Sequence, residues 1–128
     1  MKFAKIVFTI AGVWGLLVLI PMYFLRDRIG EQYPPPIAHA DFYYGFLAVT
    51  LVWQIAFLVI ARDPVRFRPM MVPAMLEKFV YIASMFVLFG LGELQAGQVA
   101  VTAPDFVLGV LFVAAFAKTR GFFPTRAS

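Results

Sequence analysis

The chain has 128 residues, of which 62% are hydrophobic and 14% are charged, with a net charge of +4. A soluble domain is about 45–50% apolar and about 25% charged, so the composition predicts one domain whose surface lies largely in lipid. The chain has no cysteine and a single histidine, His39. This excludes disulfide and thiolate chemistry, and it argues against a protein-ligated haem or a histidine-rich metal centre. We therefore expect no cofactor and no metal site.

Residues 6–25 form the first of four long apolar segments and contain no charged residue. About 20 helical residues span a hydrocarbon core of about 30 Å. Lys2 and Lys5 precede the segment, as they would in a signal peptide, but no cleavage pattern follows it. We interpret it as a retained transmembrane helix.

The connection that follows, residues 26–40, is the longest, and its three prolines at 34–36 favour a polyproline II stretch. His39 and Asp41 are spaced like a metal or acid–base pair. Asp41, however, stands where the N-cap of the next helix belongs, so we interpret it as a cap beside an interfacial histidine.

Residues 42–61 predict the second helix, which contains Trp53 and Gln54, and a short basic connection follows it. Residues 70–92 predict the third, interrupted by Glu77 and Lys78. From this depth the long side chain of Lys78 can extend to the lipid headgroups. Trp53, like Trp14 in the first helix, is expected to be a packing residue.

Residues 99–117 predict the fourth helix. The sequence Thr102-Ala103-Pro104-Asp105 resembles a capping box with proline in the first turn, so this helix is expected to begin near Thr102. Together the four segments predict an all-α polytopic membrane protein, a single antiparallel four-helix bundle over residues 1–128.

The distribution of Lys and Arg predicts the orientation of the bundle. The N-terminus, the second connection and the C-terminal tail hold eight of the eleven, including Arg126, whereas the first and third connections hold two. The positive-inside rule then places both termini in the cytoplasm. Because the basic residues lie at helix ends and not along one face, we expect no nucleic-acid partner. We expect a multi-pass location in a bacterial inner membrane, with membrane lipids as neighbours.

Polar residues inside the spans suggest one cluster. If consecutive helices are antiparallel, Gln54 and Glu77 lie at similar depth, roughly 10–12 Å from the cytoplasmic boundary, and are expected to touch. Thr50 and Tyr81 lie one turn from them on the same helix faces. Three interpretations stay open: hydrogen bonds that hold helices together, a polar floor beneath a ligand cavity, or a carboxylate that exchanges a proton.

Residues 17–89 also resemble the EXPERA family of four-helix membrane proteins, which includes the emopamil-binding sterol isomerase and the sigma-2 receptor. The resemblance lies in Ile20-Pro21 followed by Asp27, in residues 51–57 (LVWQIAF), and in Pro73-Ala74 after a basic connection. It implies a lipophilic pocket open toward the membrane, with Asp27 and Gln54 beside it. Thr50 stands where such proteins tend to carry an acidic residue, and no span contains histidine, so sterol isomerisation is not expected.

The sequence thus predicts a small membrane protein that binds a lipid-like or sterol-like molecule and has no catalytic residues. The expected ligand-binding residues are Asp27, Tyr43, Thr50, Gln54, Glu77 and Tyr81. The alternative is an accessory subunit whose apolar faces dock on a larger membrane complex, or a homodimer. The sequence leaves the ligand, the partners and the oligomeric state open.

Overall fold

The computed structural model describes residues 2–121, and no strand occurs within that range. Within this described part of the chain, four helical segments are long and apolar enough to cross a membrane, which identifies an all-helical multi-pass membrane protein. Each of the first two spans is a single helix. The third span begins with a short 3₁₀ helix, and the fourth begins with a short α-helix that is followed by a longer one. The elements are α1 (Lys2–Met22), α2 (Arg26–Gln32), α3 (Ala40–Arg62), the 3₁₀ helix η1 (Arg68–Met70), α4 (Met71–Gly90), α5 (Ala96–Ala100) and α6 (Ala103–Lys118).

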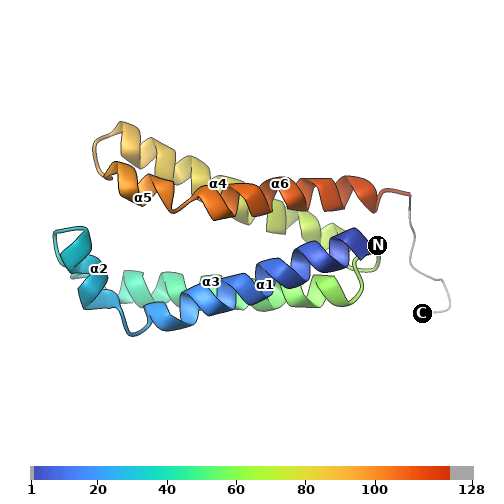
Figure 1. Ribbon diagram of the computed structural model, residues 1–128, viewed down its shortest axis with the longest axis horizontal. Helices are drawn as coiled ribbons and strands as arrows, with labels where there is room; N and C mark the ends of the chain where they lie inside the picture. The colour runs from blue at the N-terminus through green and yellow to red at the C-terminus, as the bar shows by residue number, and fades with distance from the viewer. Residues whose placement is uncertain (1, 122–128) are drawn as a thin grey trace.

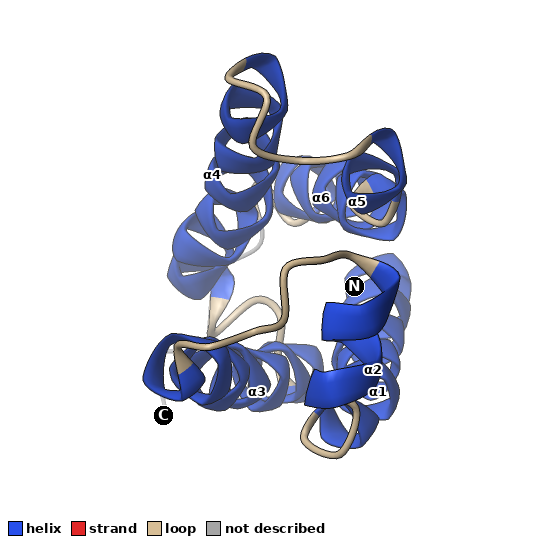
Figure 2. Ribbon diagram, turned by 90° about the vertical axis from the view of Figure 1, so that its left-hand side faces the viewer, coloured by secondary structure: helices blue, strands red, loops and turns tan. Residues whose placement is uncertain are grey.

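The long helices are arranged as two pairs. α1 lies beside α3, α4 lies beside α6, and the two pairs form two layers in which α6 also packs on α1 (Figures 1 and 2). Of the four pairings that form the sides of the bundle, α3 and α4 pack against each other least, and Figure 1 shows α4 diverging from α3 away from η1. The side of the bundle between α3 and α4 is therefore its least closely packed side.

Three buried phenylalanines form the centre of the core. Phe8 of α1 stacks on Phe112 of α6, with ring centroids 4.3 Å apart, and Phe57 of α3 meets Phe112 edge-on at 5.0 Å. All three side chains are fully buried. Stacked and edge-to-face rings at such separations attract one another beyond the effect of burial, so this trio joins three of the four spans.

Glycines allow α1 and α3 to approach closely. A Cβ atom at Gly12 would lie 2.9 Å from the backbone oxygen of Gln54, and one at Gly15 would overlap the Gln54 side chain. Small residues at such positions let two membrane helices pack backbone to backbone. The pairing of α1 with α3 therefore depends on these two glycines.

The helix ends that carry most basic residues gather at one end of the molecule (Figure 1). The Lys118 Nζ atom lies 4.3 Å from the centroid of the Phe3 ring. Arg68 donates hydrogen bonds to the Phe116 carbonyl at 2.8 Å and to the Thr119 hydroxyl at 3.1 Å. These bonds connect η1 to the C-terminal end of α6. Arg126 lies outside the described residues.

The connection after α1 differs from the prediction, because it contains the short helix α2. The Arg26 side chain donates a hydrogen bond to the Ile37 carbonyl and so folds the segment back on itself. The helix ends at Gln32, because Tyr33 precedes a proline, which disfavours helical backbone at that position. The backbone bends at residues 33–35, which include the first two prolines, so the expected continuous polyproline II stretch is not present.

One predicted helix cap is wrong, and the other is confirmed in position only. α3 begins at Ala40, so Asp41 lies in its first turn and His39 occupies the cap position without a side-chain hydrogen bond. Thr102 is the N-cap residue of α6, and Pro104 lies in the first turn, as predicted. The Thr102 hydroxyl, however, donates to the Val99 carbonyl at 2.7 Å, and its side chain makes no cap hydrogen bond. The reason is that α5 runs almost directly into α6: Pro104 has no N–H to bond to the carbonyl four residues earlier, which interrupts a helix that has already begun.

Candidate functional site

A buried ion pair connects α4 and α6. The Lys78 ammonium group donates a hydrogen bond to the Asp105 carboxylate at 2.8 Å, and the Lys78 side chain is only 5% exposed. The Lys78 Nζ atom also lies 5.2 Å from the centroid of the Phe57 ring. Gly109, one turn after Asp105, leaves room for the lysine, because a Cβ there would lie 3.2 Å from the Lys78 Cβ.

The pair lies near the middle of both spans. Lys78 is one position from the midpoint of the span Arg68–Gly90, and Asp105 is two positions from the midpoint of the span Ala96–Lys118. An isolated charge at that depth costs at least ~2.5 kcal/mol. The expectation that Lys78 extends to the headgroups is wrong, because Asp105 offers it a partner of opposite charge inside the bundle.

Glu77 lies beside this pair. Its Oε2 atom is 3.5 Å from the Lys78 Nζ atom, is buried, and has no hydrogen-bond partner. Tyr81 follows one turn later on α4, and its ring stacks on Phe46 of α3 with centroids 6.4 Å apart. We define Glu77, Lys78, Tyr81 and Asp105 as the charged cluster.

Gln54 is fully buried but faces α1. Its amide nitrogen donates a hydrogen bond to the Thr50 carbonyl of its own helix at 2.9 Å, and its side chain fills the space above Gly15. Among the described residues no hydrogen bond joins Gln54 to Glu77, so that predicted contact is wrong. The orientation follows from Gly15, which opens a space for the amide on the α1 side.

Tyr43 and Asp27 lie apart from the charged cluster. The Tyr43 hydroxyl donates a hydrogen bond to the Met22 carbonyl at 2.6 Å, which joins the end of α1 to the start of α3. Asp27 is an exposed residue in the first turn of α2. Of the six predicted site residues, the structure thus joins Thr50 with Gln54 and places Glu77 and Tyr81 on one face of α4.

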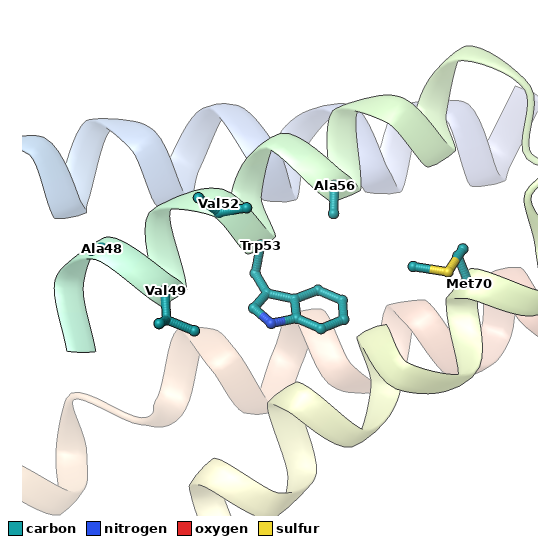
Figure 3. A pocket seen from close by; sticks show the side chains of 6 residues that line it. All are labelled: Ala48, Val49, Val52, Trp53, Ala56 and Met70. Atoms are coloured by element: carbon teal, nitrogen blue, oxygen red, sulfur yellow. The ribbon is translucent and has the colours of Figure 1, made fainter. Parts of the chain in front are cut away.

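A groove of about 560 Å³ runs along α3, on the side that faces α4, and Met70 of η1 completes its lining. Figure 3 shows the Trp53 indole projecting from α3 toward α4, with Met70 facing the same space. Trp53 also packs against the core and carries the only side-chain N–H on the wall. The groove is lined by Ala48, Val49, Val52, Trp53, Ala56 and Met70.

The predicted polar residues do not line this groove. Gln54 faces α1, as described above, and Glu77 lies two turns from Met70 along the same face. The wall is therefore almost entirely apolar. Between residues 2 and 121 no group of three or more Asp, Glu or His side chains could hold a metal ion.

No family model, curated protein or solved structure matches the chain.

Sequence reasoning missed the role of Asp105, which was interpreted as part of a helix cap. One signal was available: Asp105 is the only acidic residue in the predicted segment 99–117, and Lys78 is the only basic residue in the predicted segment 70–92. Two opposite charges in adjacent membrane spans favour a pair, because each unpaired charge is costly in lipid. Nothing in the sequence predicts that the Phe57 ring lies beside the Lys78 ammonium group.

Proposed function

We propose that the protein binds a lipid-like or sterol-like molecule in the groove that Trp53 and Met70 line. The groove carries the proposal, because its volume of about 560 Å³ falls within the ~300–1,000 Å³ of small-molecule sites. It belongs to a membrane-spanning helix, α3, so a lipophilic molecule can enter it directly from the bilayer.

The chemistry of the wall favours an amphiphile with a large apolar body and few polar groups. Five of the six lining residues offer methyl, methylene or thioether groups, and Trp53 offers one hydrogen-bond donor. Such a donor can orient a single hydroxyl or carbonyl oxygen while the body of the ligand packs on the indole. No residue of the groove has the acid or base that catalysis would need, so we propose binding without reaction.

We propose an antiparallel bundle in a bacterial inner membrane with both termini on the cytoplasmic side. The gathering of basic helix ends at one end of the molecule supports this, because cytoplasmic connections carry an excess of Lys and Arg. The groove along α3 would then open toward the lipid.

The resemblance to the EXPERA family is part of the proposal and rests on the sequence alone. A groove open to the side of the bundle supports it, whereas the position of Asp27 on α2 and of Gln54 against α1 does not. A lipophilic ligand is therefore proposed from the groove, and the resemblance adds a class of molecule to test.

Native mass spectrometry of the protein released from mild detergent tests the proposal. The expected result is a monomer or dimer that retains one small lipophilic molecule per chain at activation energies that strip bulk lipid. Release of the chain without any retained molecule, or only as part of a complex with larger polypeptides, would contradict it. The second outcome would instead identify an accessory subunit.

A further inference from the structure

We infer that Glu77 is a proton-binding site inside the membrane, with its carboxyl group protonated at neutral pH while Asp105 is ionised. This proton site is independent of any ligand in the groove. The charged cluster contains one ammonium group, that of Lys78, and two carboxyl groups, those of Glu77 and Asp105.

The geometry distinguishes the two carboxyl groups. Asp105 accepts a hydrogen bond from Lys78 at 2.8 Å, the length of a strong charge-assisted bond. The nearest Glu77 oxygen is 3.5 Å from the same nitrogen, and that buried oxygen accepts no hydrogen bond. The positive charge of Lys78 is therefore committed to Asp105, and Glu77 is left without full compensation.

Among residues 2–121, no further cation faces the cluster from the helices around it. α3 presents the uncharged rings of Phe57 and Phe46, and α6 presents Asp105. The only charged residues of α1, Lys2 and Lys5, are exposed near its start. Tyr81 adds a neutral hydroxyl group on α4. A second negative charge would stand near the middle of the bilayer, and a proton on Glu77 removes it.

Glu77 and Asp105 are also the only acidic residues that are not exposed. The other five are Asp27, Glu31, Asp41, Asp63 and Glu93, all at the surface. Exposed carboxyl groups are ionised at neutral pH. A protonated carboxyl group detected in the folded protein at neutral pH must therefore belong to the charged cluster.

Infrared spectroscopy of the full chain in lipid nanodiscs at neutral pH tests the inference, because a protonated carboxyl group absorbs apart from a carboxylate. The unaltered protein is expected to show one protonated carboxyl band that shifts when the chain is made with ¹³C-labelled glutamate and not with labelled aspartate. This measurement needs no substitution. Absence of the band, or a shift with labelled aspartate alone, would overturn the inference.

Two variants sharpen the test. Glu77→Gln removes the extra carboxyl group, so the band is expected to disappear. Asp105→Asn is also expected to abolish it, because Lys78 is then free to pair with an ionised Glu77. Retention of the band in Glu77→Gln would contradict the assignment, and retention in Asp105→Asn would contradict the charge count. Unchanged gel-filtration elution and circular dichroism establish that each variant is folded.

Discussion

Lys78 of α4 and Asp105 of α6 form a 2.8 Å ion pair close to the middle of their two membrane spans. The pair joins the last two spans, and the ring of Phe57 brings the second span against the same lysine. Since a buried pair offsets its own desolvation only with good geometry, the surrounding helices must hold both side chains in register. The charged cluster is thus a structural link as well as the proposed proton site.

Replacing Lys78 should destabilise the bundle more than replacing Asp105. Lys78→Met leaves two carboxyl groups without a cation and is expected to cost about 3–5 kcal/mol, the usual cost of breaking a buried pair. Asp105→Asn should cost less, because Glu77 is only 3.5 Å from the lysine and can take over. Thermal unfolding in mild detergent measures both. An equal or larger loss in Asp105→Asn would contradict this order.

A double substitution measures the interaction between Lys78 and Asp105 apart from the effect of each side chain alone. Lys78→Met combined with Asp105→Leu removes both charges and is expected to be more stable than Lys78→Met alone, because no unpaired charge remains. Additive losses in the same unfolding measurement would show that the two side chains act independently.

The close approach of α1 and α3 gives a prediction about packing. Gly12→Ala places a Cβ atom 2.9 Å from the backbone oxygen of Gln54, which cannot move as a side chain can. We expect a loss of about 1–3 kcal/mol from overpacking. Gly45→Ala is the control: it lies in α3 with open space around it, and it should be neutral or stabilising by up to about 1 kcal/mol. Equal effects of the two would contradict the packing argument.

The transmembrane segments were predictable from the sequence because an uncharged run of about 20 residues has few other stable environments. Four spans were expected, and residues 2–121 contain four candidate spans. The boundaries differ by a few residues, since helices extend beyond their apolar core into charged flanks such as Lys2 and Arg62. The helix α2 was missed because its seven residues carry no apolar periodicity.

The direction of individual side chains was not predictable. Gln54 was expected to face Glu77, but Gly15 of α1 provides the space that it fills. Asp105 was expected in a cap, but the preceding helix α5 makes a cap unnecessary and leaves the carboxylate for Lys78. Both outcomes depend on which faces of distant helices meet, and that information lies in tertiary packing, not in local sequence.

Arg68 should stabilise the end of α6. Its guanidinium group donates to the Phe116 carbonyl and the Thr119 hydroxyl and lies 3.7 Å from the centroid of the Phe116 ring. Because hydrogen bonds from charged groups contribute about 1.5–3 kcal/mol, Arg68→Ala should lower the free energy of unfolding by about that amount. Arg66→Ala, an exposed neighbour, should have little effect. A comparable loss in both would point to net charge and not to these bonds.

The proposed orientation can be measured directly, because the chain has no cysteine of its own. Single cysteines at Gln95 and at Arg66, both exposed, should react with a membrane-impermeant thiol reagent from opposite sides. We expect Gln95→Cys to be labelled in intact cells and Arg66→Cys only after permeabilisation. The reverse pattern would contradict the cytoplasmic placement of the basic end.

Filling the groove tests the proposed function most directly. Ala56→Phe places a ring inside the groove, whereas Ala83→Phe adds the same ring to an exposed position of α4 that does not line the groove. Native mass spectrometry of the three proteins from the same membranes should show one retained lipophilic molecule in the unaltered chain and in Ala83→Phe, and none in Ala56→Phe. Equal retention in all three proteins would show that the molecule is not held in this groove.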